Sequence, residues 1–237
     1  MSVRTIDDGY DFRVVVLDDT WVVRVPRWEF AREALVMEAA LLPVLAPALP
    51  AEIPRFEHAE GFAVYRLIGG TPLHDEEVGV REFLAALHAF DVGDLPVRRP
   101  DWIESYRGQC DEFRRVVLPL LDSVERRRAE ALFTDVETLT GFTPALTHSD
   151  LGPEHLLCGD GRLAGVIDWG DARVGDPAID YAWLLNVPFP HWDVDDELRR
   201  RARFYHRLGP WFEAHFGVFG GDETRVARGL AGISSRL

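Results

Sequence analysis

Three polar side chains in the second half of the 237-residue chain have types and spacing that suit catalysis. Asp150 precedes a Gly-Pro loop, His155 follows it by five residues, and Asp168 ends an apolar stretch. A carboxylate on such a loop could orient a nucleophilic hydroxyl, while an imidazole and a second carboxylate could hold a metal ion on a triphosphate. Phosphoryl transfer needs little beyond positioning and cations on the developing charge. The three residues therefore predict that chemistry.

The sequence around these residues resembles the aminoglycoside phosphotransferase family, a branch of the protein-kinase-like fold. The resemblance is carried by His148-x-Asp150-x-x-x-x-His155, Asp168-Trp169-Gly170-Asp171 and Gly175-Asp176-Pro177-x-x-Asp180-Tyr181-Ala182. It implies that Asp150 is the catalytic base or orienting carboxylate, and that His155 and Asp168 bind Mg²⁺. The broad family has asparagine where His155 stands, and histidine resembles the variant found in the 2''-phosphotransferases. Because histidine is a softer ligand than oxygen, the choice between Mg²⁺ and Mn²⁺ stays open.

The first part of the chain resembles the nucleotide-binding lobe of the same family. Arg24 stands where the family has its phosphate-binding lysine, in an Arg-x-Pro form that also resembles the macrolide kinases, and Glu38 stands where a helical glutamate pairs with that cation. Residues 66–68, just before Gly69, match the hinge whose backbone groups contact the purine in this family. The donor implied is ATP or GTP, which the sequence does not distinguish because that contact is made mainly by backbone groups. The residues implied at the nucleotide are Gly9, Tyr10, Arg24, Glu38, Arg66 and Ile68.

All 26 basic side chains are arginine, and the sequence contains no lysine. Schiff-base chemistry, a Walker-type lysine and a lysine general base are therefore excluded. A side chain that clamps phosphate must be an arginine, which stays protonated and suits bidentate contacts.

The elements that must position these residues form an α+β pattern. Valine-rich stretches around a short polar turn predict a hairpin. The glycine- and proline-containing stretch Gly69-Gly70-Thr71-Pro72 interrupts regular structure and predicts a domain boundary. We expect a kinase-like fold with a small antiparallel-sheet lobe over residues 1–68 and a larger helical lobe over 69–237. The predicted strands are 12–17, 21–25, 62–68, 155–158 and 163–169, and the predicted helices are 30–45, 80–90, 102–121, 123–138, 177–185 and 195–216.

The amino-acid composition limits the classes of molecule that the protein is expected to bind. With 40 acidic and 26 basic side chains the net charge is −14 and the pI is near 5.0. This balance disfavours nucleic acid and an anionic membrane, both of which select basic faces. Cys110 and Cys158 form no metal-binding spacing, and the sequence shows no apolar leader or span. We expect a soluble cytoplasmic protein whose partner is a small molecule with a hydroxyl group.

Several polar residues have a simpler structural interpretation. His148 is expected to hold its loop by hydrogen bonds, and Asp176 and Asp180 to brace a loop and a helix start. The arginine runs 126–128 and 199–201 are expected to be solvated helix faces.

The prediction for function is transfer of a γ-phosphoryl group to a small-molecule hydroxyl, with an aminoglycoside-type antibiotic as the leading acceptor. The alternatives are a macrolide or metabolite alcohol as acceptor, or a catalytically silent nucleotide-binding protein. The segment 186–192 has no carboxylate and is apolar and aromatic, so we expect weak activity on common aminoglycosides. The alternative interpretation is that this segment only packs the helical lobe. The sequence leaves the oligomeric state and the role of the last fifty residues open.

Overall fold

The structure is a computed structural model that describes residues 2–6, 9–74, 79–186 and 192–237. It divides into two compact units. The first unit contains the residues up to Arg98 together with Ala145–Val174, and the second contains Arg99–Pro144 together with Gly175–Leu237. The boundary at residue 69 expected from the sequence stays a prediction.

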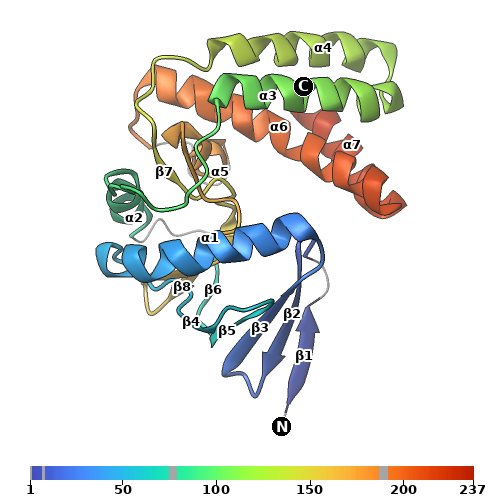
Figure 1. Cartoon of the computed structure of the whole chain (residues 1–237). Helices are drawn as coiled ribbons and strands as arrows, with labels where there is room; N and C mark the ends of the chain where they lie inside the picture. The colour runs from blue at the N-terminus through green and yellow to red at the C-terminus, as the bar shows by residue number, and fades with distance from the viewer. Residues whose placement is uncertain (1, 7–8, 75–78, 187–191) are drawn as a thin grey trace. The chain divides into compact units, whose positions relative to one another are not determined.

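The first unit begins with a five-stranded antiparallel sheet in the order β1-β2-β3-β5-β4 (Figure 1). Its strands are β1 (Val3–Ile6), β2 (Phe12–Leu17), β3 (Trp21–Pro26), β4 (Phe56–His58) and β5 (Ala63–Arg66). The β2–β3 hairpin turns through Asp18 and Asp19, whose φ angles are 48° and 45°. Positive φ at both central residues is the turn that matches the twist of paired strands, and Asp tolerates it better than most residues.

Helix α1 (Glu29–Leu45) lies against this sheet (Figure 1). A buried cluster of Phe12, Ala31, Leu35 and Ala63 joins the helix to strands β2 and β5. The contact fixes the rotation of α1, and so determines which of its side chains points toward β3.

Two smaller sheets and one helix complete the first unit. The sheets are β6-β8-β9 and β7-β10, with β6 at Thr71–Pro72, β7 at Ala145–Thr147, β8 at Leu156–Gly159, β9 at Arg162–Val166 and β10 at Arg173–Gly175. The last residue of β10, Gly175, belongs to the second unit. Helix α2 spans Val80–His88. Two loops leave these sheets, residues 148–155 between β7 and β8 and residues 167–172 between β9 and β10, and they carry the three predicted catalytic residues.

The second unit is helical. Its helices are α3 (Trp102–Val116), α4 (Ser123–Thr134), α5 (Ala182–Asn186), α6 (Asp196–Gly220) and α7 (Glu223–Arg236). Its short 3-10 turns lie at Leu118–Leu120, Asp135–Thr138 and Pro177–Ile179, whereas those at Ala46–Ala48 and Pro153–His155 belong to the first unit. Helices α6 and α7 approach closely at Gly229, where a Cβ atom would lie only 2.4 Å from the backbone nitrogen of Ala214. The absence of a side chain on Gly229 permits this approach.

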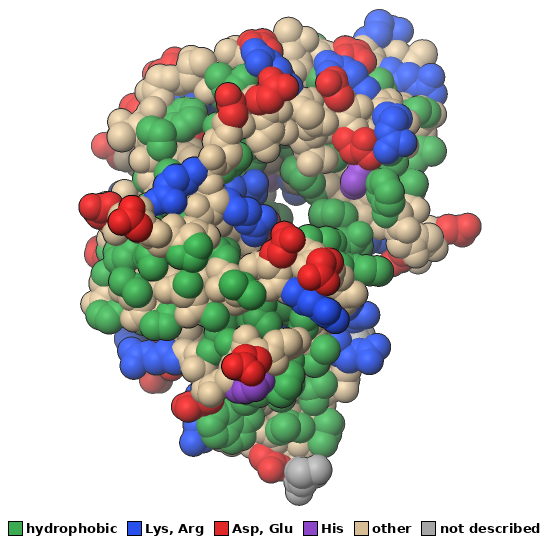
Figure 2. Space-filling model, viewed as in Figure 1, with side chains coloured by type: hydrophobic (Ala, Val, Ile, Leu, Met, Phe, Trp, Pro, Cys, Tyr) green, Lys and Arg blue, Asp and Glu red, His purple; other side chains and the backbone are tan. Residues whose placement is uncertain are grey.

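The surface of α3 and α4 interleaves arginine with carboxylates (Figure 2). Arg114 contacts Asp111 at 2.8 Å and Glu130 at 2.9 Å, and the run Arg126–Arg128 is exposed as expected. The run 199–201 differs, because Arg201 is buried and its Nε donates to Asp176 Oδ2 at 2.8 Å. Tyr205, one helical turn after Arg201, donates to the same oxygen at 2.9 Å. The prediction of a solvated face was wrong at Arg201.

Asp176 also accepts from the backbone N–H of Ala178 at 3.0 Å, so it caps the turn at Pro177–Ile179. This confirms its expected structural role. Among the described helices, none is long and apolar enough to cross a membrane.

Candidate active site

The orientation of the His155 ring is set by its own loop. Its Nδ1 lies 2.6 Å from the backbone oxygen of Asp150. A carbonyl oxygen can only accept, so Nδ1 carries the hydrogen and Nε2 of the neutral ring carries the lone pair. That Nε2 lies 3.8 Å from Oδ2 of Asp168. The loop therefore presents a metal-binding nitrogen to the carboxylate expected to share the metal.

Asp168 stands in a backbone conformation that few residues adopt. Its φ is 64°, and that of Ser149 in the facing loop is 70°. Such conformations persist only where the surroundings enforce them, and they concentrate at functional sites. Ser149 is held through its hydroxyl, which accepts from Arg173 Nε at 3.0 Å. Asp168 is held through Oδ1, which accepts from Arg24 Nη2 at 2.7 Å.

His148 joins the two loops from inside the protein. Its ring is fully buried beside Trp169, with ring centroids 4.7 Å apart. Nε2 lies 2.9 Å from the carbonyl oxygen of Ile167, to which it must donate, and Nδ1 accepts from the N–H of Asp150 at 3.4 Å. His148 thus ties the residues preceding Asp168 to the loop of Asp150, which agrees with the structural role expected for it.

Arg24 and Glu38 form a buried pair between β3 and α1. Nη1 of Arg24 donates to Oε1 and Oε2 of Glu38 at 2.8 and 3.1 Å, and the ring of Phe12 lies 4.0 Å from the guanidinium carbon. Glu38 Oε1 also accepts from the N–H of Trp169 at 3.1 Å. Burial opposes the charge on Arg24, but Glu38 and Asp168 raise its pKa above the ordinary value. The guanidinium therefore stays protonated and links sheet, helix and loop.

The carboxylates of the site differ in how readily they hold a proton. Burial, followed by the charges of Asp171 and Asp168, raises the pKa of Asp150 to about 6, although His155 opposes the shift. Burial would also raise the pKa of Asp168, but Arg24 and His155 outweigh it and lower that pKa. Asp168 therefore holds its charge firmly, while Asp150 has a pKa suited to accepting a proton near neutral pH.

Sequence comparisons with known proteins identify the family of the chain. A family model described as "Phosphotransferase enzyme family" matches residues 2–216. The chain belongs to the phosphotransferase enzyme family. A viomycin phosphotransferase of Streptomyces vinaceus is 31% identical over 198 residues, covering 72% of this chain and 69% of the relative. The uncharacterized protein YcbJ of Bacillus subtilis (strain 168) is 27% identical over 243 residues, covering 86% of this chain and 74% of that protein.

Solved structures of this phosphotransferase family share the fold. A GDP complex of an aminoglycoside 2'-phosphotransferase-IIIa mutant superposes with a TM-score of 0.87 at 25% identity, covering 100% of this chain and 91% of the other. A macrolide 2'-phosphotransferase from Brachybacterium faecium has a TM-score of 0.74 at 25% identity, with 98% and 92% covered. The predicted kinase-like α+β fold is thereby confirmed.

The residues of this phosphotransferase-family chain fit a divalent cation. Nε2 of His155 and Oδ2 of Asp168 face each other, while Oδ1 of Asp168 is engaged by Arg24. No group of three or more His, Cys, Asp or Glu ligands occurs within the described residues. Mg²⁺ commonly takes one or two protein ligands and completes its shell with phosphate oxygens and water, so a two-ligand site is sufficient.

The remaining sequence-predicted residues lie elsewhere in the first unit. Gly9 and Tyr10 follow β1 and precede β2, and the Tyr10 carbonyl accepts from Trp28 Nε1 at 3.1 Å. Arg66 ends β5 with its guanidinium carbon 3.8 Å from the ring centre of Trp21. Ile68 is buried. Their part in nucleotide binding stays a prediction.

Sequence reasoning missed Asp11. Burial, then Asp171 and Asp168, raise the pKa of Asp11 to about 6, and Asp150 adds to the shift. The site thus gathers Asp11, Asp150, Asp168 and Asp171 in addition to the Glu38 paired with Arg24, an excess of negative charge that a cation would relieve. Two features of the sequence could have indicated these additional acids. Asp11 directly follows the predicted nucleotide-binding residues Gly9 and Tyr10, and Asp171 closes the Asp-Trp-Gly-Asp motif.

Proposed function

We propose that this phosphotransferase-family protein transfers the γ-phosphoryl group of ATP or GTP to a hydroxyl of a small molecule, with an aminoglycoside-type antibiotic as the leading acceptor. One observation carries the proposal: His155 and Asp168 face each other beside Asp150, and Asp168 is bonded to Arg24. The similarity to a viomycin phosphotransferase and to an aminoglycoside 2'-phosphotransferase in a GDP complex supports this choice of donor and acceptor class.

The role proposed for Asp150 is to orient the acceptor hydroxyl and take its proton. The hydroxyl oxygen attacks the γ-phosphorus as the bond from that phosphorus to the β–γ bridging oxygen breaks, and the nucleoside diphosphate leaves. The pKa of Asp150 near 6 keeps the carboxylate ionised at neutral pH while leaving it basic enough to accept the proton.

Arg24, His155 and Asp168 are proposed to bind the donor. A guanidinium has five N–H groups, and the described bonds of Arg24 engage only its two terminal nitrogens, so donors remain for a phosphate oxygen. His155 and Asp168 would hold a divalent cation, which neutralises charge on the phosphates when bound. Glu38 positions the Arg24 side chain in this assignment.

The acceptor is constrained by the segment 186–192, of which residues 187–191 lie outside the described part of the chain. Asn186 donates to the carbonyl of Ala182 at 2.8 Å, and Trp192 is buried with its ring 5.8 Å from Tyr181. Asp195 caps α6 by accepting from the N–H of Leu198 at 2.7 Å, so this nearby acid has a structural task. We therefore expect weak phosphorylation of polycationic aminoglycosides.

A less charged acceptor is the second candidate. The apolar sequence of 186–192 and the similarity to a macrolide 2'-phosphotransferase support a macrolide. The proposal is tested by incubating the protein with ATP or GTP, Mg²⁺ or Mn²⁺, and a panel of aminoglycosides, viomycin, macrolides and metabolite alcohols. Mass spectrometry is expected to find an acceptor heavier by one phosphoryl group, and Asp150→Asn to form that product roughly 10²–10⁴ times more slowly.

Nucleotide binding by calorimetry separates this proposal from the silent alternative. Binding of both nucleotides without any phosphorylated acceptor across the panel would favour a catalytically silent nucleotide-binding protein. Efficient, strongly salt-sensitive phosphorylation of kanamycin or gentamicin would instead show that acidic residues elsewhere suffice, and that the interpretation of 186–192 is wrong.

A further inference from the structure

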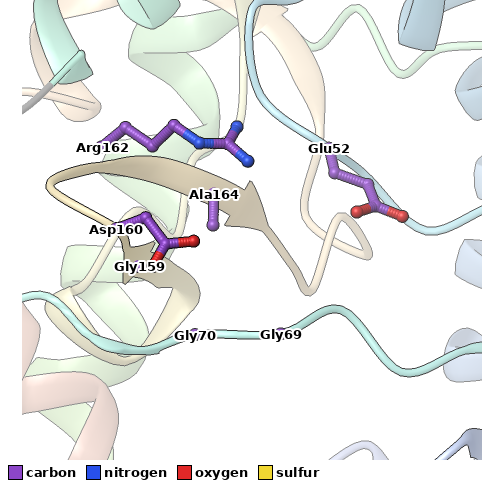
Figure 3. Close-up of a pocket in the computed structure, with 7 residues that line it drawn as sticks. All are labelled: Glu52, Gly69, Gly70, Gly159, Asp160, Arg162 and Ala164. Carbon is purple, nitrogen blue, oxygen red and sulfur yellow. The ribbon is translucent and has the colours of Figure 1, made fainter.

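A hollow of about 450 Å³ lies in the first unit and shares no lining residue with the site around Asp150 (Figure 3). Three stretches of chain form its walls: Gly69 and Gly70 after β5, the turn and outer strand of the β8–β9 hairpin, and the segment around Glu52. We call it the hinge pocket, because Gly69 directly follows Ile68 at the predicted purine-reading hinge. Its volume suits a small organic molecule.

Backbone bonds hold two of the walls together. The N–H of Glu52 donates to the carbonyl of Ala164 at 3.0 Å, and the carbonyl of Glu52 accepts from the N–H of Val166 at 2.8 Å. Gly70 has φ of +127°, and a Cβ atom there would lie 3.0 Å from the carbonyl oxygen of Cys158. Glycine is thus required for the chain to pass this close to β8. The hinge pocket is therefore built on positioned backbone.

Three charged side chains from different stretches line the hinge pocket. Arg162 and Asp160 extend from the hairpin toward the same space, Ala164 points into it, and Glu52 lies on the opposite side (Figure 3). Within the described residues, none of the three charged side chains makes a hydrogen bond or an ion pair. One guanidinium donor fork and two carboxylates are thus available to a ligand, with a net charge of −1.

We propose that the hinge pocket binds a basic α-amino acid, with the ligand carboxylate on Arg162 and its two cationic groups on Glu52 and Asp160. A guanidinium fork pairs bidentately with a carboxylate, and charge-assisted bonds are the strong ones. A diamine would leave Arg162 without a partner, whereas an acidic ligand would meet two carboxylates. A molecule with one anionic and two cationic groups matches all three side chains.

The binding test uses isothermal titration calorimetry without nucleotide, with L-arginine as the probe. Agmatine, which lacks the carboxylate, and L-citrulline, which lacks the side-chain charge, are the comparison ligands. We expect saturable binding of arginine at least about tenfold tighter than of either comparison ligand, which corresponds to one charge-assisted contact. Equal affinities for arginine and agmatine, or no saturable heat with arginine, would overturn the proposal.

Substitutions of the pocket residues test which side chains contact the bound arginine. Arg162→Gln is expected to weaken arginine binding about tenfold and to remove the preference over agmatine, and Glu52→Gln to weaken it by a similar factor. The matched controls are Arg55→Gln and Glu57→Gln, which change exposed residues outside the pocket. Ala164→Leu fills the pocket and is expected to abolish binding. Unchanged affinity in Arg162→Gln and Ala164→Leu would place any bound arginine elsewhere.

Occupancy of the hinge pocket should also alter nucleotide affinity, an extension that rests on the proposed function. A ligand spanning Glu52 and the β8–β9 hairpin would restrain Gly69 and Gly70, and through them the backbone of Ile68. We expect saturating arginine to shift the nucleotide dissociation constant at least about threefold in the wild type and not in Arg162→Gln. Arginine binding with an unchanged nucleotide constant would overturn the coupling, and neither measurement depends on phosphoryl transfer.

Discussion

Glu38→Ala tests the buried pair that joins β3, α1 and the Asp168 loop. The substitution removes the acceptor of two bonds from Arg24, at 2.8 and 3.1 Å, and of one from the N–H of Trp169, at 3.1 Å. The side chains of Arg24 and Glu38 are only 4% and 0% exposed, so water cannot replace these bonds. Removing one partner of a buried ion pair costs about 3–5 kcal/mol. Because Asp168 still engages Arg24, we expect about 3 kcal/mol.

Urea unfolding measures this loss, and two further variants calibrate it. Glu38→Gln keeps one acceptor oxygen and loses the charge, so we expect a loss of about 1–2 kcal/mol. Glu33→Ala removes an exposed carboxylate from the same helix and should change the free energy of unfolding by no more than about 0.5 kcal/mol. A loss in Glu38→Ala no larger than in Glu33→Ala would refute the reasoning that this pair stabilises the first unit.

Three other predictions concern catalysis, metal and pH. Asp150→Asn should lower turnover by roughly 10²–10⁴ with nucleotide affinity unchanged, whereas exposed Asp94→Asn should change neither; near wild-type turnover would exclude Asp150 as base. His155→Ala should raise the Mg²⁺ concentration needed for half-maximal activity about tenfold or more, and His155→Asn should stay Mg²⁺-dependent; identical titration curves for wild type and His155→Ala would remove His155 from the metal shell. Burial, and secondarily the positive charge of Arg236, lowers the pKa of His206 from 6.5 to about 4. As the pH falls, this imidazole is therefore protonated in the unfolded chain before it is protonated in the folded protein. Stability should therefore decline between pH 6.5 and 4 with a slope of up to about 1.4 kcal/mol per pH unit, and a slope equally steep in His206→Phe would contradict that origin.

The elements with strong local signals were predictable. Valine-rich stretches and a polar turn gave β2 and β3 with nearly the observed bounds, and helical periodicity gave α1, α2 and α3. Strands β1, β4, β6, β7 and β10 were missed as strands, because all five are only two to four residues long, and β6, β7 and β10 also pair with segments distant in sequence. Helix α7 was missed because its glycines weaken the helical signal, while their purpose is close packing on α6.

The residues of the site were predictable in part, but the hydrogen bonds and ion pairs that connect them were not. The spacing of Asp150, His155 and Asp168 singled them out, yet the hydrogen on His155 Nδ1 follows from a carbonyl that only the folded loop brings near. The bond from Arg24 to Asp168 joins residues 144 positions apart. Arg201 shows the same limit, since three successive arginines look alike in sequence and only packing against Asp176 distinguishes one.

The use of arginine at position 24 has a consequence for chemical labelling of the site. Reagents that acylate nucleotide-binding proteins rely on a lysine amine that attacks as a neutral nucleophile. No side chain of this sequence carries an amine, and Glu38 and Asp168 hold the Arg24 guanidinium protonated and therefore non-nucleophilic. Acyl-phosphate probes and other lysine-directed inhibitors should accordingly leave the side chains of this phosphotransferase-family protein unmodified, and the protonated Arg24 guanidinium offers no nucleophile in place of the lysine.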